Sequence, residues 1–137
     1  MIGMMKSCLV ALAGICIAIS ALADTKVPKA TPRLQAQEVL FPKQDGKSIY
    51  EGVCQGCHMP GGKGAAGAGT YPALANNPHL ETAGYLVGII INGQKAMPRL
   101  GPYFSDQQIA NVVNYIRTHF GNRYSDPVTA ADVKAQR

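Results

Sequence analysis

Cys54-Gln55-Gly56-Cys57-His58 is the most specific motif in this sequence. Two thiols three positions apart can add to the two vinyl groups of a haem, and the adjacent histidine can then ligate the iron. Cys-x-x-Cys also occurs in zinc half-sites and dithiol redox pairs. Zinc usually takes ligands from two such pairs, and a thioredoxin-like dithiol sits among alternating strands and helices. The chain has no second pair and no such alternation, so the motif predicts one covalently attached haem c held by Cys54, Cys57 and His58.

Met97-Pro98 supplies a candidate for the second axial ligand of that iron. Met59 directly follows the histidine of the motif and cannot reach the opposite face of the ring. Met97 as ordinary core filler is the alternative, since methionine packs in many environments. His79 and His119 are the other candidates, although His119 ends an expected helix, where a cation suits the dipole. We expect His58 and Met97 to be the metal ligands, which closes both axial sites and suits electron transfer.

Residues 1–23 have the layout of a secretory signal peptide. Lys6 lies near the amino terminus, residues 8–22 are apolar, and small residues precede Asp24. The apolar run is shorter than the roughly 20 residues that span a bilayer. We therefore expect a periplasmic protein, with membrane contact only if the segment is uncleaved. Cleavage would leave the two cysteines of the motif as the only ones, which excludes a framework of disulfides.

The charge balance is weakly basic. The chain has 13 Lys and Arg against 8 Asp and Glu, a formal net charge of +5, and loses Lys6 on cleavage. It has no runs of Lys and Arg with interleaved aromatic residues, so we expect no nucleic-acid partner. A weakly basic surface suits an acidic protein partner instead.

The chain around the motif divides into a leader, a folded region and a tail. Residues 24–43 contain three prolines and little apolar periodicity, so we expect an extended leader. A helix is predicted just before the cysteines, with Gly46, Ile49, Tyr50 and Val53 on its buried face. Residues 59–77 are rich in Gly and Ala and show no period. They predict a long surface loop, held in place by a ligand that it wraps.

One motif in that loop resembles a nucleotide-binding sequence, but we do not interpret it as one. Gly62-Lys63-Gly64-Ala65-Ala66-Gly67 matches the dinucleotide fingerprint G-x-G-x-x-G. No strand is predicted before it and no helix directly after it, so the match does not indicate a nucleotide site. A flexible loop is the better interpretation.

Two longer helices are predicted after the loop. The first lies between Thr82 and Gly93, although the β-branched run Ile89-Ile90-Ile91 leaves a strand open. The second spans residues 105–120. Ser105 and Gln108 form a capping box, Phe104 and Ile109 a hydrophobic staple, and Gly121 can end the helix. In the tail, Thr129 can cap one more turn, with Asp132 at its third position.

Together these residues resemble the class I c-type cytochromes, over about residues 44–121. The resemblance implies an all-α fold, a small cytochrome c domain of three to five helices wrapped around one covalently bound haem. It implies that Gly46 and Tyr50 of the first helix meet the last helix at Val112, Tyr115 and Ile116. The leader (24–43) and the tail (122–137) fall outside the family core.

The resemblance also implies a partner for the histidine of the motif. Tyr71-Pro72-Ala73-Leu74 is similar to the family segment whose proline carbonyl holds the ring of that histidine. Pro72 would then fix the tautomer and the basicity of His58.

Residues 97–121 are similar to cytochrome subunits and small cytochromes that serve periplasmic dehydrogenases. This implies an electron carrier rather than an enzyme, taking electrons from a periplasmic dehydrogenase and passing them to a terminal oxidase or another cytochrome. A peroxidase-like enzyme with an open iron site and a fixed haem subunit of a dehydrogenase complex are the alternatives. Lys63, Lys95 and Arg99 flank the two ligand loops, where they would line an exposed haem edge or simply be solvated.

Overall fold

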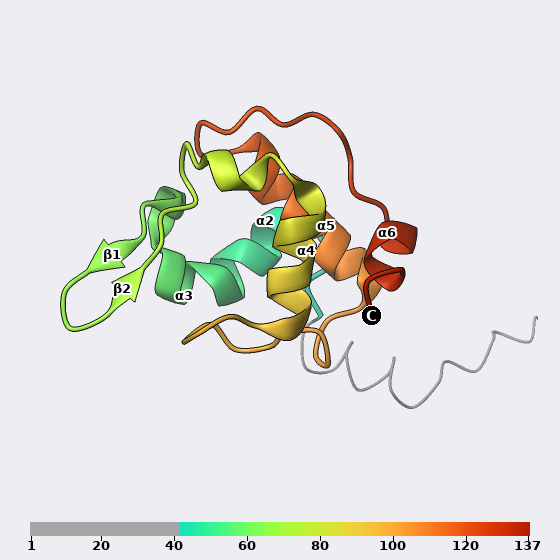
Figure 1. Ribbon diagram of the computed structural model, residues 1–137, viewed down its shortest axis with the longest axis horizontal. Coiled ribbons are helices and arrows are strands. Elements are labelled where there is room, and N and C mark those ends of the chain that lie inside the picture. Colours follow the sequence, from blue (N-terminus) through green and yellow to red (C-terminus); the bar gives the residue numbers. More distant parts are fainter. Residues whose placement is uncertain (1–41) are drawn as a thin grey trace, which may run out of the picture.

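The structure, a computed structural model, describes residues 42–137. The expected signal peptide (1–23) and residues 24–41 of the expected leader lie outside the described residues, so both stay predictions. The regular structure of the described part is mostly helical (Figure 1). Its elements are α2 (Gly46–Ile49), a π-helical turn (Tyr50–Cys54), α3 (Gln55–His58), a 3-10 turn (Pro60–Gly62), β1 (Ala65–Ala66), β2 (Thr70–Tyr71), a second 3-10 turn (Pro78–Leu80), α4 (Ala83–Asn92), α5 (Asp106–Thr118) and α6 (Ala130–Lys134).

The first helical segment runs without a break from α2 through the π-turn into α3. Asp45 caps it, because its side chain accepts a hydrogen bond from the backbone N–H of Ser48 at 2.8 Å. In the π-turn, the backbone N–H of Gln55 donates to the carbonyl of Tyr50, five residues earlier. The predicted helix before the cysteines is confirmed, and it continues as far as the histidine of the motif.

The first segment packs closely against α5. A Cβ atom at Gly46 would lie 2.1 Å from the carbonyl oxygen of Asn111 and 2.7 Å from Cβ of Tyr115, so only glycine permits this approach. The rings of Tyr50 and Tyr115 lie with their centroids 5.8 Å apart, and those of Tyr50 and Phe120 4.7 Å apart. The contact that the family resemblance implied between the first and last helices is therefore present.

α4 forms as a helix, so the alternative of a strand is wrong. It begins after Thr82, whose backbone is extended, and ends at Gly93, which has φ +73° and donates its N–H to the carbonyl of Ile89 at 2.8 Å. Its inner face is buried against the core. The buried side chains are Leu86, Val87, Ile90 and Ile91.

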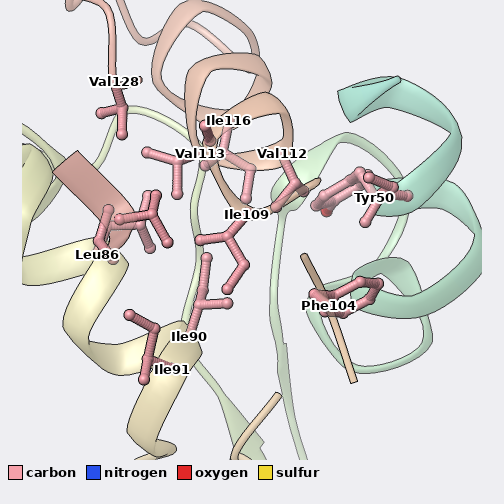
Figure 2. Close-up of a cluster of buried hydrophobic side chains, with 14 of the residues drawn as sticks. Tyr50, Leu86, Ile90, Ile91, Phe104, Ile109, Val112, Val113, Ile116 and Val128 are labelled. Carbon is pink, nitrogen blue, oxygen red and sulfur yellow. The ribbon is translucent and has the colours of Figure 1, made fainter. Parts of the chain in front are cut away.

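α5 has the capping box that the sequence predicted. The N–H of Gln108 donates to Oγ of Ser105 at 3.2 Å, and the N–H of Ser105 donates to Oε1 of Gln108 at 2.9 Å. The helix ends at Thr118, two residues before the expected end, because the backbone of His119 is extended, and Phe120 and Gly121 then adopt φ +58° and +83°. Its apolar stripe forms the centre of the core shown in Figure 2, with Ile109, Val112, Val113 and Ile116 all buried.

The loop after α3 adds one very small sheet to the helical fold, and the all-α class still describes the domain. β1 and β2 form a short antiparallel hairpin in which Ala65 pairs with Tyr71 and Ala66 with Thr70. Each strand has two residues, which is too short to leave an alternating pattern in the sequence. The predicted structureless loop over residues 59–77 is thus wrong in part, since it holds this hairpin and a 3-10 turn.

The segment after α5 returns to the body of the domain and ends in α6 (Figure 1). Thr129 caps α6 in a capping box with Asp132, as the sequence predicted. Val133 of α6 is fully buried, and Val128 before it is nearly so. Within residues 42–137, none of the helices combines the length and the apolar character needed to cross a bilayer.

Candidate haem-binding site

Both cysteines of the motif lie at the carboxyl end of the first helical segment. Cys54 closes the π-turn and is partly buried, whereas Cys57 lies in α3 and is exposed, and neither forms a disulfide. Burial raises the pKa of the Cys54 thiol to about 12. Reactive dithiols have thiols whose pKa is lowered. The raised pKa of Cys54 therefore counts against a dithiol redox pair.

His58 is held by a backbone carbonyl. Its Nδ1 lies 2.9 Å from the carbonyl oxygen of Pro72. Because a carbonyl oxygen only accepts, Nδ1 must carry the proton in this contact, and in the neutral ring Nε2 then carries none. A bare Nε2 with Nδ1 tied to a carbonyl is the usual state of a histidine that ligates a metal. The contact implied for Pro72 by the family resemblance is present.

Gly64 allows the segment of Pro72 to come this close. It has φ +65°, and a Cβ atom there would lie 2.4 Å from the carbonyl oxygen of Tyr71 and 2.8 Å from the carbonyl carbon of Pro72. The N–H of Gly64 also donates to the carbonyl of His58 at 2.9 Å. One glycine thus touches the end of α3 and the segment that positions its histidine. Sequence reasoning missed this role, although the declined glycine motif had marked the position.

Gly62, in the same motif, fixes the chain that follows Pro72. Its carbonyl accepts hydrogen bonds from the N–H groups of Leu74 at 2.7 Å and Ala75 at 2.9 Å. Its φ of +68° and the ring of Phe120, 3.0 Å from a hypothetical Cβ, leave no room for a side chain. The two glycines therefore serve to fold the loop back on itself, and no nucleotide site is needed to explain them.

Tyr50 fixes the backbone directly after His58. Its hydroxyl donates to the carbonyl of Met59 at 2.8 Å. Burial raises the pKa of Tyr50, which keeps the hydroxyl protonated and able to donate. Met59 itself has φ +64°, so the chain turns away sharply at the end of α3. The sequence indicated that Tyr50 was buried and gave no sign of this hydrogen bond.

Met97 lies in a tight turn after α4. The N–H of Gln94 donates to the carbonyl of Met97 at 3.1 Å, and the N–H of Met97 donates back at 2.9 Å. Lys95 inside this turn has φ +53°. Met97 is partly buried and packs against the same hydrophobic core as Cys54. Its backbone is therefore fixed, although no described contact joins Met97 to His58.

The other two histidines belong to different surroundings. His79 is exposed in the 3-10 turn Pro78–Leu80. His119 is exposed at the end of α5, where its Nδ1 lies 2.9 Å from the carbonyl of Tyr115 and its ring stacks on that tyrosine at 4.1 Å. None of the described contacts joins either histidine to His58 or to the cysteines.

The donor set fits haem c. It consists of two free thiols on one helical segment, a histidine whose Nε2 is available, and a thioether in a fixed turn. In the part of the chain that the structure describes, no three His, Cys, Asp or Glu side chains gather into a group that could hold a metal ion. The described residues thus lack the ligands that a zinc site would require.

Comparison with known families agrees with this donor set. Residues 42–116, more than half of the chain, match the family model described as cytochrome c oxidase, cbb3-type, subunit III. The chain belongs to this family of c-type cytochromes. The resemblance found in the sequence is therefore confirmed.

Several curated proteins are similar to this cytochrome. The fructose dehydrogenase cytochrome subunit of Gluconobacter japonicus is 34% identical over 118 residues, which cover 75% of this chain and 24% of that protein. The alcohol dehydrogenase (quinone) cytochrome c subunit of Gluconacetobacter polyoxogenes is 39% identical over 105 residues, covering 67% of this chain and 22% of that protein. Cytochrome c6 of a Synechococcus strain is 32% identical over 73 residues, which cover 53% of this chain and 65% of that protein.

The cytochrome spans about a quarter of the length of the dehydrogenase subunits that it matches. Its family and its relatives show an electron carrier, or an electron-transfer subunit, that is not itself catalytic. The alternative of a peroxidase-like enzyme with an open iron site is therefore set aside.

Proposed function

We propose that this cytochrome carries one electron at a time in the periplasm, on a single haem c around which its helices wrap. Cys54 and Cys57 would form the two thioether links, and His58 and Met97 the two axial bonds to iron. The observation that supports this most directly is the hydrogen bond between His58 and Pro72, because it leaves Nε2 of His58 free and aimed by a fixed backbone.

Haem c, when bound, supplies a redox couple, in which the iron changes between the ferric and the ferrous state. The residues of the chain would set the reduction potential of that couple and keep other molecules from binding the iron. A thioether from Met97 is a soft ligand that favours the ferrous state, and the hydrogen-bonded imidazole of His58 opposes it by favouring the ferric state. With His58 and Met97 both holding the iron, no small substrate would have a place to bind. Electron transfer is then the reaction that remains.

The electron donor in this proposal is a periplasmic dehydrogenase, and the acceptor is a terminal oxidase or another cytochrome. The names of the relatives, which are cytochrome subunits of fructose, alcohol and gluconate dehydrogenases, support the donor. Charge supports docking of an acidic partner near the ligand loops. Lys63, Lys95 and Arg99 are exposed there, and Glu81 is the only Asp or Glu between residues 52 and 105.

The proposal is tested by producing the chain in a host that attaches haem and weighing the mature protein. We expect the mass of the cleaved chain plus one haem, a low-spin reduced spectrum and no binding of carbon monoxide under native conditions. The variant in which both cysteines are serine is the control and should carry no covalent haem. An unmodified wild-type mass would overturn the proposal.

A reduction assay tests the partner separately. Reduction of the holoprotein by candidate dehydrogenases should slow as salt rises, since exposed charges are screened within about 10 Å at 0.1 M salt. The triple variant K63Q, K95Q and R99Q should be slower at low salt and lose this dependence. A rate that ignores salt in the wild type would count against docking through these three residues.

A fixed haem subunit of a dehydrogenase complex is the second candidate, and the same relatives favour it, because their names describe subunits. Purification of the tagged chain from its own host distinguishes the two. A dehydrogenase that copurifies at constant stoichiometry at high salt supports the fixed subunit, and a chain that elutes alone supports the free carrier.

A further inference from the structure

The segment after α5, residues 121–137, is fastened along that helix from its end to its beginning. Near the end of α5, Arg117 donates to the carbonyl of Asp126 at 2.5 Å. One turn earlier, the side chain of Asn114 pairs with the backbone of Val128 by two hydrogen bonds, each 2.8 Å long. We call this segment the strap. It runs antiparallel to α5, and Figure 1 shows it in red above and beside that helix.

The strap includes α6, and through α6 and the residues after it the strap packs against α5 and α4. Val133 has no exposed surface and packs within the core cluster together with residues of α5. Gln136, beyond α6, lies over α4, because its side-chain atoms are 3.3 and 3.5 Å from where Cβ atoms would stand at Gly84 and Gly88. The strap is thus a packed part of the domain up to the residue next to Arg137.

Arg137 reaches the loop that carries Met97. We call residues 93–105 the Met97 loop. The Arg137 guanidinium donates to the carbonyl of Gly101 at 2.7 Å and to that of Phe104 at 2.8 Å, and its Nε bonds to the carboxylate of Asp106, the first residue of α5. One side chain therefore joins the strap, the Met97 loop and the start of α5.

We propose that Arg137 is a positioning residue for Met97, holding the second half of the Met97 loop against α5. This inference rests on the proposed function, in which Met97 binds the iron. The loop is already tied to α4 closer to Met97, since the N–H of Leu100 donates to the carbonyl of Ile90 at 2.9 Å and that of Gly101 to Ile91 at 3.2 Å. Arg137 fixes the stretch that follows, so that the loop is held on both sides of Gly101.

The consequence concerns how often Met97 leaves the iron. Movement of the loop would displace Met97, and the two hydrogen bonds from Arg137 exist only while the loop is in place. An external ligand such as imidazole binds the displaced state, so its apparent affinity measures how populated that state is. The pair of Arg137 with Asp106 joins the strap to α5 and does not depend on the loop, so the two carbonyl contacts are what holds the loop. Removing them should raise the displaced population roughly three- to tenfold.

The test is an imidazole titration of the ferric holoprotein, followed by loss of the weak charge-transfer band of methionine-ligated haem. Arg137→Gln should bind imidazole about three- to tenfold more tightly than the wild type. Lys134→Gln is the matched control, because Lys134 is an exposed residue of α6 and its loss removes the same charge. It should change the affinity less than about twofold. Arg137→Lys, which keeps the charge but has a single donor nitrogen, should fall between the two.

Three outcomes separate the possible failures. Equal affinities in Arg137→Gln and Lys134→Gln would overturn the positioning role. A wild type that shows no methionine band would refute Met97 as a ligand and so remove the proposed function itself. Val113→Ala opens a cavity in the core, and its lower midpoint of thermal unfolding serves as a measure of general destabilisation. If it tightened imidazole binding as much as Arg137→Gln, the effect would be general and the inference would be lost.

Discussion

Substituting Gly64 by alanine tests whether the loop after α3 positions His58. Gly64 has φ +65°, and a Cβ atom there would lie 2.4 Å from the carbonyl oxygen of Tyr71, far inside van der Waals contact. The clashing atoms are backbone, so the segment of Pro72 must move. The hydrogen bond from His58 to Pro72 then lengthens or breaks.

The magnitude follows from two effects. A left-handed conformation costs an L-residue about 1–2 kcal/mol. Loss of one net hydrogen bond adds about 0.5–1.5 kcal/mol, and the lower end applies because the contact of His58 is exposed to water. The Gly64→Ala holoprotein should therefore lose about 2 kcal/mol, which lowers the midpoint of thermal unfolding by roughly 10 °C for a domain of this size.

The same change should raise the reduction potential. A hydrogen bond from Nδ1 makes His58 a stronger donor and favours the ferric state, so its loss favours the ferrous state. A difference of about 0.5 kcal/mol between the two states corresponds to a rise on the order of 20 mV, since a tenfold change is 59 mV for one electron.

The assay is thermal unfolding followed by circular dichroism, together with a redox titration of the same holoprotein. Gly67→Ala is the control in the same loop, because nothing lies within 4 Å of its hypothetical Cβ and its φ is not left-handed. It should stay within about 0.5 kcal/mol of the wild type. If the two variants unfolded at the same temperature with the same potential, the argument that Gly64 places the segment of Pro72 would be refuted.

Three further predictions concern the ligand, the buried arginine and pH. Met97→Leu should lose the methionine band and bind carbon monoxide without denaturant, and failure to bind it would show that another group closes the iron. Arg117→Met removes the donor at 2.9 Å to the buried carbonyl of Leu80 and should cost about 2–4 kcal/mol in urea unfolding, whereas a loss below about 0.5 kcal/mol would contradict this. Hydrogen bonds from Thr129 lower the pKa of Asp132, so its contribution to folding is complete above the unfolded pKa of about 3.9 and disappears as the pH falls through the lower folded pKa. Asp132→Asn should reduce the loss of stability below about pH 4, which acid unfolding curves would measure.

Much of the helical framework could be predicted because its signals are local. The capping box of Ser105 and Gln108 and the apolar stripe behind it lie within a few turns of α5. Thr129 and Asp132 likewise identified α6 from four adjacent positions. Such signals depend on neighbours in sequence, so they can be recognised without knowing how the rest of the chain packs.

The parts that were missed depend on contacts between distant segments. Arg117 follows Ile116 directly and has no exposed surface, yet its partners Leu80 and Glu81 precede it by 37 and 36 residues. Nothing near Arg117 in the sequence indicates those carbonyls. The same holds for Arg137, whose partners lie in the Met97 loop.

The candidate site shows both situations. The cysteines and His58 were evident from their spacing alone, because covalent attachment requires adjacent residues. Pro72 came only from the family resemblance, since a carbonyl partner 14 residues away leaves no pattern. Gly64 was noticed for the wrong reason, as part of a nucleotide motif, and its use became visible only beside Tyr71.

The π-turn at Tyr50–Cys54 sets the rotation about the helix axis between α2 and α3, the two halves of the first helical segment. Ile49 before it and Tyr50 at its start are buried in the core, and His58 after it lies against the carbonyl of Pro72. Deleting Gly52 would restore the hydrogen bonds of a regular α-helix, between residues four apart. It would also rotate α3 by about 100° around the helix axis. Both halves would remain helical, but His58 would turn away from its carbonyl. The direction in which His58 points therefore depends on the one extra residue in the π-turn.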